Sequence, residues 1–155
     1  MVALPKVTLS TEMNEGLCFG CGQNNPIGLK LKFSRDGNTF RSEFTPNQHH
    51  QGWPGIVHGG IIISVLDEAM SYATYLEGIN CLTATMEAKF KRLAKVDEPL
   101  VVTSSITKHT RKLIKTKARV SLRDGTLVAE STATQFIVET KPGDASNKGE
   151  PQSDA

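Results

Sequence analysis

The chain contains a glycine-rich turn that runs directly into a long apolar helix. The turn covers residues 54–60, and the run that follows to Met70 consists mainly of Ile, Val, Leu, Ala and Met. A helix with apolar residues around most of its circumference must be surrounded by protein. The pair Glu77-Gly78 is a typical helix end. The rest of the chain is therefore expected to wrap around one buried helix.

A narrow stripe of small or polar residues interrupts the apolar surface of this helix. At ~100° per residue, the two groups separate onto opposite sides. The stripe holds Gly60, Ser64, Asp67, Ser71 and Thr74, and the opposite arc holds Ile62, Val65, Leu66, Ala69, Ala73 and Leu76. Such a stripe suits a substrate channel or a closely packed second copy of the chain.

Two acids lie in the middle of the helix. Asp67 is at the centre of the stripe, and a carboxylate on a mostly buried helix tends to have a perturbed proton affinity, which indicates a base or nucleophile. Glu68 is expected at the rim of the apolar arc beside Tyr75, where solvent or a salt bridge could satisfy it. The alternative for Asp67 is a structural hydrogen bond to Ser64, Ser71 or a neighbouring strand.

The start of the helix favours the functional interpretation. Gly59 and Gly60 allow a ligand to approach the backbone closely, and the first helical amides have no acceptor within the helix. The turn is therefore a candidate oxyanion or anion site, about two and a half helical turns before Asp67. The loop at 45–57 directly precedes it and is rich in hydrogen-bonding side chains, which is typical of functional loops.

The remaining segments have the pattern of strands. They are separated by turn signals at Asp36-Gly37 and Asp124-Gly125. The predicted strands cover residues 29–33, 39–44, 81–90, 100–107, 114–122 and 126–138. This order predicts an α+β fold in which a curved antiparallel sheet of five to six strands wraps the helix. We expect an N-terminal arm at 1–16, one folded domain at 17–139 and a disordered tail at 140–155.

Composition sets limits on the function. The net charge is only +2 and charged residues make up 22% of the chain, so nothing calls for nucleic acid or an anionic membrane as a partner. No apolar run reaches membrane-spanning length, and the first residues lack the pattern of a secretion signal. Three cysteines, an odd number, favour a reducing compartment. The sequence predicts a cytoplasmic protein.

A Cys-x-x-Cys pair raises the question of a metal. Cys18 and Cys21 have the spacing of zinc or redox sites, but a structural zinc needs four ligands and no second cysteine pair exists. His49 and His50 could complete a set only by a coincidence of folding. We therefore predict no metal and interpret the segment as a Gly- and Asn-rich loop leading into the first strand.

Several motifs together resemble those of hotdog-fold acyl-CoA thioesterases, the PaaI-like or 4-hydroxybenzoyl-CoA-thioesterase-like group. The main signature is His58-Gly59-Gly60 with Asp67 nine positions after the histidine. The turn Gln51-Gly52-Trp53-Pro54-Gly55 resembles that of mitochondrial long-chain acyl-CoA thioesterases. The Cys-x-x-Cys-Gly and Asn-Pro-x-Gly-Leu opening resembles many bacterial members. The resemblance covers about residues 18–139.

This resemblance implies a mechanism. Asp67 would attack the thioester or activate water, the Gly59 amide would polarise the carbonyl, and His58 would help to bind the thioester. Thr83 matches a residue that the partner subunit contributes to position water. Several relatives carry Asn or Gln at the position of Gly52, and Gln51, His50 or Gln48 are possible substitutes here. The family implies no cofactor, because coenzyme A is part of the substrate, and a homodimer with shared active sites or a tetramer.

Further substrate contacts are expected around the site. They are Gly60, Gln51, His50, Ser64 and Glu68 near the thioester, and Arg92, Arg111 and Lys112 for the phosphates of coenzyme A. Two alternatives stay open. One is a hotdog module that binds acyl-CoA or an acyl carrier without hydrolysis, against which the buried Asp67 argues. The other is a hydratase or dehydratase that pairs His58 with Glu68.

Overall fold

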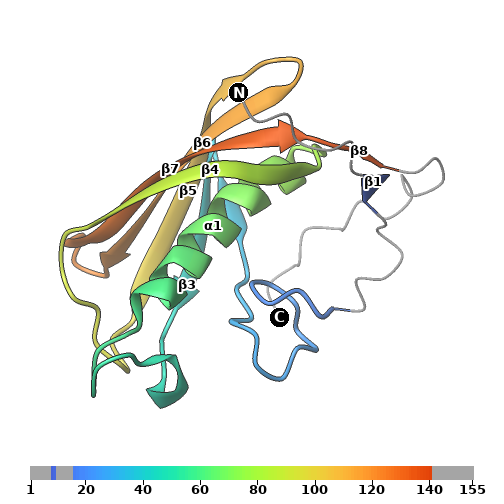
Figure 1. The fold of residues 1–155 in the computed structure, drawn as a ribbon. Helices are drawn as coiled ribbons and strands as arrows, with labels where there is room; N and C mark the ends of the chain where they lie inside the picture. Colours follow the sequence, from blue (N-terminus) through green and yellow to red (C-terminus); the bar gives the residue numbers. More distant parts are fainter. Residues whose placement is uncertain (1–7, 10–15, 141–155) are drawn as a thin grey trace.

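One antiparallel sheet of six strands forms the main body of the protein (Figure 1). The computed structural model describes residues 8–9 and 16–140. The strands are β2 Ser34–Asp36, β3 Thr39–Phe44, β4 Cys81–Phe90, β5 Leu100–His109, β6 Leu113–Leu122 and β7 Leu127–Ile137. Their spatial order is β2-β3-β5-β6-β7-β4, which places β4 at an edge of the sheet. Five of the six predicted strands are thus confirmed, with bounds that differ by a few residues.

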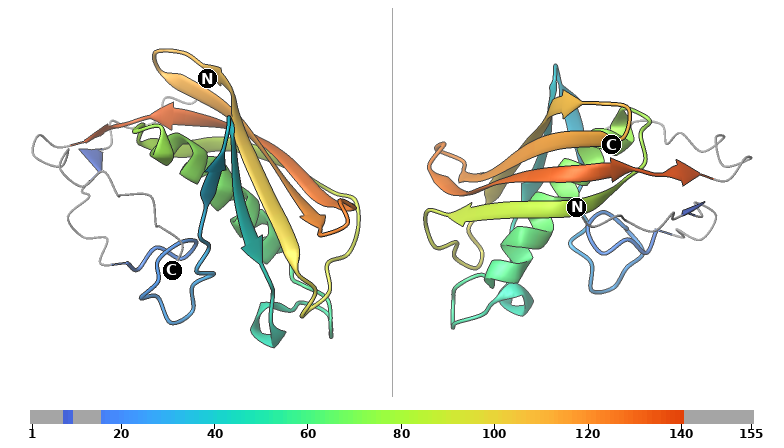
Figure 2. Two further views of the ribbon diagram at one scale, coloured as in Figure 1. Left: turned by 180° about the vertical axis from the view of Figure 1, so that it is seen from behind. Right: turned by 45° about the horizontal axis from the view of Figure 1, so that its top comes forward.

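The single α-helix of the described residues, α1 Gly59–Leu76, lies against the concave face of the sheet (Figures 1 and 2). Its apolar arc forms the core together with strand residues, and Val65, Leu66 and Ala69 have no exposed surface. The burial of these side chains is the main driving force that holds the helix to the sheet. The arrangement confirms the predicted α+β class and the hotdog architecture.

The segment at 29–33 is not a strand, contrary to the prediction. Its burial does alternate, with Leu29 and Leu31 buried and Lys30 exposed. However, Lys30 has a positive φ of 54°, which interrupts an extended strand. The backbone N–H groups of Leu29 and Leu31 donate instead to Phe19 O and Gly20 O in the preceding loop. The alternation therefore arises because one face of this segment is buried, and the segment does not pair with a strand of the sheet.

Three short elements complete the described chain. The 3-10 helix η1 Gln48–His50 lies in the loop before α1 and was not predicted. A parallel pair joins β1 Thr8–Leu9 to β8 Glu139–Thr140. The predicted arm at 1–16 and tail at 140–155 lie almost wholly outside the described residues. No helix in the described part of the chain has the length and apolar character needed to cross a membrane.

Candidate active site

The imidazole of His58 caps the start of α1. His58 has extended backbone angles, and its Nδ1 accepts a hydrogen bond from Gly60 N–H at 2.8 Å. Its carbonyl accepts from Ile61 N and Ile62 N. The Gly60 amide is therefore not the free donor that the sequence predicts. Among the described residues no acceptor contacts Gly59 N–H, so this amide keeps its donor free at the helix N-terminus.

The capping bond also determines what His58 can offer a ligand. Because Nδ1 accepts a hydrogen bond, the proton of the neutral ring lies on Nε2. His58 is exposed, so this Nε2–H is available as a donor. Gly52 lies directly beside the ring, where an added Cβ would be 3.3 Å from His58 Cδ2. A larger residue at this position would crowd the ring, which gives a local reason for glycine.

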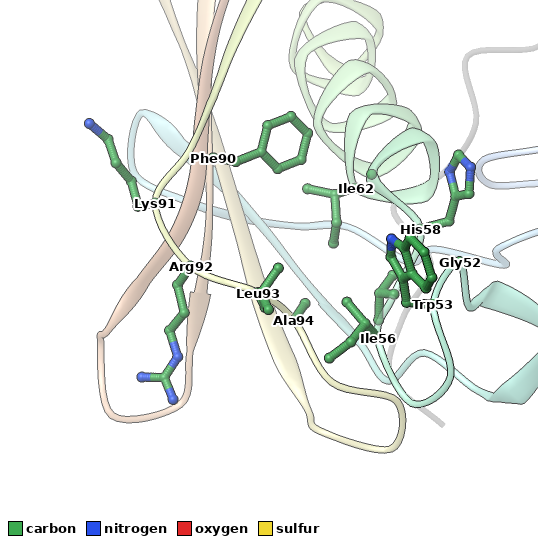
Figure 3. A pocket seen from close by; sticks show the side chains of 12 residues that line it. Gly52, Trp53, Ile56, His58, Ile62, Phe90, Lys91, Arg92, Leu93 and Ala94 are labelled. Carbon is green, nitrogen blue, oxygen red and sulfur yellow. The ribbon is translucent and has the colours of Figure 1, made fainter.

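A cavity of about 850 Å³ opens beside the helix start (Figure 3). Most of its wall is apolar, and Trp53 is 81% exposed and Phe90 50% exposed. The lining residues are Gly52, Trp53, Ile56, Val57, His58, Gly59, Ile62, Phe90, Lys91, Arg92, Leu93 and Ala94. The side chains of Lys91 and Arg92 extend away from the helix start (Figure 3). The cavity therefore combines an apolar wall with a free backbone donor at Gly59 and positive charge on the opposite side.

Asp67 is hydrogen-bonded to Thr83 within the same chain. Thr83 Oγ1 on β4 donates to Asp67 Oδ1 at 2.8 Å. The resemblance implied that this threonine comes from the partner subunit, and the structure instead brings Thr83 to the carboxylate of its own helix. Asp67 is partly exposed rather than deeply buried. Its second carboxylate oxygen, Oδ2, has no hydrogen-bond partner among the described residues.

A β-bulge in β4 turns Thr83 toward the helix. The pairing of β4 with β7 shifts between Thr83 and Thr85, so that Ala84 has no opposite residue. After the bulge, Met86 packs against the core. Strict alternation would put Thr83 and Met86 on opposite faces of the strand, whereas the extra residue allows both to face α1. The sequence pattern contains no sign of this bulge.

Asp67 and Gly59 of one chain are well separated along the helix. Asp67 comes eight positions after Gly59, a rise of about 12 Å along the axis. A reacting carbonyl must lie roughly 3–3.5 Å from the attacking atom and about 3 Å from the oxyanion donor. Asp67 therefore does not directly reach a carbonyl bound to Gly59 of its own chain, and the spacing favours a pair of groups from different chains.

Glu68 lies half-buried against the N-terminal loop, whereas solvent or a salt bridge at the rim near Tyr75 was expected to satisfy it. Burial raises the pKa of Glu68. Both carboxylate oxygens lie 3.8 Å from Cys18 Sγ, and Gly20 covers the carboxylate so closely that a Cβ would overlap it. Glu68 is also ten residues along the helix from His58, so the two do not form an acid–base pair within one chain.

The polar residues of the preceding loop mainly hold the loop itself. Gln51 Oε1 accepts from Gly55 N at 3.0 Å, and His50 Nδ1 accepts from Asn47 N at 2.9 Å. These bonds do not reach Asp67. The partner of the Asp67 carboxylate is Thr83, whereas a side chain of this loop was expected to replace the Asn or Gln that several relatives carry at the position of Gly52. Ser64 Oγ donates to the backbone oxygen of Gly60 at 2.8 Å and so is also engaged within the helix.

The predicted basic residues fall at two ends of the sheet. Arg92 follows the end of β4 and lines the cavity. Lys112 and its neighbour Arg111 lie in the β5–β6 turn. This turn is near the start of β4, because Lys112 O accepts a hydrogen bond from Ile137 N and Ile137 pairs with the first residue of β4. The ten residues of β4 separate these ends by about 30 Å. One chain therefore does not bring Arg92 and Arg111 together.

The state of His50 makes the loop sensitive to pH. Partial burial and the neighbouring His49 lower the pKa of His50 below 6.5. The unfolded chain then binds this proton at a higher pH than the folded chain, so folding stability falls as the pH drops through about 6.5. Protonation would also remove the acceptor for Asn47 N. We expect chemical denaturation of the His50→Gln variant to show a weaker loss of stability at acidic pH than the wild type or the His109→Gln control, in which the exposed His109 at the end of β5 is replaced. Equal pH slopes in all three would contradict this assignment.

Comparison with known proteins points to one family. Residues 54–129 match the model of the thioesterase superfamily. Human acyl-coenzyme A thioesterase THEM5 is 32% identical over 65 residues, which make up 42% of this chain and 26% of that protein. Bovine acyl-coenzyme A thioesterase THEM4 is 26% identical over 131 residues, 83% of this chain and 54% of the relative. The chain thus spans about half the length of these curated relatives, or less.

Solved structures share the fold. A hypothetical thioesterase from Streptococcus pneumoniae, determined with coenzyme A, superposes with a TM-score of 0.66 at 14% identity, over 70% of this chain and 86% of that one. The Escherichia coli PaaI protein of the phenylacetic acid degradation operon gives a TM-score of 0.66 at 17% identity, over 70% and 83% of the two chains. These likenesses concern the architecture of the helix and sheet.

Proposed function

Because residues 54–129 match the thioesterase superfamily, we propose that this chain hydrolyses the thioester of an acyl-coenzyme A to a free acid and coenzyme A. The observation that carries the proposal is the free Gly59 amide, which stands at a helix N-terminus and lines an apolar cavity of about 850 Å³. The names of the curated relatives support the same substrate class.

The proposed role of the helix start is to stabilise negative charge. During attack on the thioester carbonyl, charge develops on its oxygen, and a fixed N–H donor stabilises that charge most where water is excluded. The partial positive charge of the helix N-terminus adds to the effect. In this proposal the carbonyl oxygen binds Gly59 N–H, the Nε2–H of His58 supplies a neighbouring donor, and the acyl chain lies along the apolar cavity wall.

Asp67 is proposed as the general base. Thr83 donates to Oδ1 and so leaves Oδ2 to take a proton from water. The water oxygen then adds to the carbonyl carbon, the carbon–sulfur bond breaks, and the departing thiolate of coenzyme A receives the proton that Asp67 took from water, which restores the carboxylate. Direct attack by Asp67, which would form a mixed anhydride, is the alternative route. The hydrogen bond to Thr83 favours the base, because it holds the carboxylate in one orientation for water.

A shared active site is the second part of the proposal. Asp67 and Gly59 of one chain are about 12 Å apart, so the base of one subunit would act with Gly59 of the partner subunit. β4 is at an edge of the sheet and carries Thr83, which makes this edge the natural place for a second copy. The proposed assembly is a homodimer with two composite sites.

The positive charge near the cavity suggests where coenzyme A lies. Lys91 and Arg92 are proposed to meet its phosphates, Arg92 with a bidentate fork and Lys91 as a point charge. Arg111 and Lys112 are about 30 Å away along β4 and could contribute only from a partner subunit.

Mixed dimers test the shared site directly. The Asp67→Asn and Gly59→Pro variants should each be nearly inactive, and their dimers should regain activity when the two chains are unfolded together and refolded. Each mixed dimer then contains one site with both an intact Asp67 and an intact Gly59 amide. Random pairing predicts about a quarter of the wild-type rate in the mixture.

The controls for this experiment are the two variants refolded separately. If the mixture shows no more activity than their sum, Asp67 and Gly59 do not act from different chains. The assay follows release of free thiol from a panel of acyl-CoA substrates. Binding without thiol release would indicate a binding module, and a change in enoyl absorption without thiol release would indicate a hydratase.

A further inference from the structure

Three potential metal ligands meet between the N-terminal loop and helix α1. They are the thiols of Cys18 and Cys21 and the carboxylate of Glu68, and their ligand atoms all lie within 4.8 Å of one another. Cys18 Sγ is 3.8 Å from each oxygen of Glu68. The proposed hydrolysis uses none of these side chains.

The cluster has no ion-pair partner in the described part of the chain. None of the ion pairs found there includes Glu68. Three groups that can each carry negative charge thus share a partly buried space, an arrangement that a bound cation would stabilise.

We propose that Cys18, Cys21 and Glu68 bind one Zn²⁺ ion. Zinc binds thiolate at about 2.3 Å and carboxylate oxygen at about 2.0–2.2 Å, so ligand atoms around a tetrahedron lie roughly 3.5–3.8 Å apart. The 3.8 Å separation of Cys18 Sγ from the Glu68 oxygens fits this requirement. Two soft sulfur donors with one oxygen favour zinc over magnesium or calcium. Water or an external ligand takes the fourth position.

The loop holds both cysteines in place for such an ion. Gly22 N donates to Cys18 O at 2.8 Å, which closes the turn around the pair. Gly20 leaves room for the Glu68 carboxylate, because a Cβ at this position would overlap it. Further along, Leu29 N donates to Phe19 O at 2.7 Å. A loop braced in this way against the central helix provides the preorganised support that a metal site needs.

The sequence could not reveal the third ligand. Cys18 and Glu68 are 50 residues apart, and the prediction of no metal rested on the missing second cysteine pair. The fold supplies a carboxylate from α1 instead. The proposed ion would tie the loop to the helix, and this role is independent of thioester hydrolysis.

Cobalt titration of the full chain tests the site. The protein is reduced, freed of metal with a chelator, and titrated with Co²⁺ in the absence of oxygen. We expect one equivalent to bind with thiolate-to-cobalt charge-transfer absorption and to be displaced by Zn²⁺. Cys18→Ser and Cys21→Ser should each weaken binding by roughly 100-fold, and Glu68→Gln by roughly 10-fold or more. Cys81→Ser is the matched control, because Cys81 lies at the start of β4 and outside the cluster.

A second measurement uses the wild-type chain and does not depend on whether a variant folds. Zn²⁺ should protect Cys18 and Cys21, but not Cys81, from alkylation, as read by peptide mass spectrometry. Zn²⁺ should also raise the Tm of the wild type and of Cys81→Ser, but not that of Cys21→Ser. Equal labelling of Cys18 and Cys21 with and without Zn²⁺, or cobalt binding without charge-transfer absorption, would overturn the proposal. Either result would leave the assay for acyl-CoA hydrolysis unaffected.

Discussion

The Asp67→Asn variant is expected to lose about 10²–10⁴-fold in kcat, the range that a positioned general base contributes. Asparagine has nearly the same shape as aspartate and can still accept the hydrogen bond from Thr83 Oγ1. It cannot take a proton from water at neutral pH. The loss should therefore appear in kcat, with little change in KM and no change in Tm or in the oligomeric state measured by gel filtration.

Glu77→Gln is a suitable control for this variant. Glu77 caps the C-terminal end of the same helix and pairs with Arg35 on the surface, so the change also replaces a carboxylate with an amide on α1. It should leave kcat close to the wild-type value. Full activity of Asp67→Asn would remove Asp67 from the mechanism, whichever of the two chemical routes applies.

The second large effect is expected from the loss of a single backbone hydrogen. Gly59→Pro removes the N–H group at the first position of α1, where proline is well tolerated because this donor has no partner in the helix. The preceding His58 has φ −60° and ψ 134°, which suits a residue before proline. We expect kcat to fall by about 10²–10³-fold, as for the loss of other oxyanion-hole donors.

Gly59→Ala separates the donor from the added side chain. It introduces a Cβ but keeps the N–H group, and this Cβ would lie 3.6 Å from the Phe90 ring, an ordinary contact distance. Most of the wild-type kcat should remain. If the alanine and proline variants lost activity equally, the effect would come from crowding near Phe90, and the Gly59 amide would not be the oxyanion donor.

The main elements were predictable because their patterns are strong and local. The bounds of β4 match the prediction for residues 81–90, and α1 ends at Leu76, beside the Glu77-Gly78 pair. In Gly78 a φ of 76° provides the left-handed turn that stops the helix. Patterns of this kind depend on burial of one face, which the chain encodes residue by residue.

The errors arose where contacts distant in sequence decided the structure. Burial of Leu29 and Leu31 alternates as in a strand, but their backbone groups bond to the loop at residues 19–20. The position of Glu68 on the helix also led to a wrong prediction of its surroundings, because the loop that covers it lies about fifty residues earlier in the chain. Helical periodicity gives the direction of a side chain but not what a distant loop places above it.

The candidate site was found from a motif, and its geometry came only partly from the sequence. The spacing of Gly59 and Asp67 already implies a separation of about 12 Å within one helix. The contact between Asp67 and Thr83 within one chain was not predictable, since it depends on the unpaired Ala84 in β4.

That unpaired residue links the direction of Thr83 to the way in which β4 pairs with β7. If β4 kept its length and paired regularly, Thr83 and Met86 would lie on opposite faces, and the Thr83 hydroxyl would point to the outer surface, away from Asp67. Substitution of Ala84 itself would leave the offset unchanged. During divergence, loss of the bulge should therefore be accompanied by loss of one residue from β4, so that Thr83 continues to face Asp67.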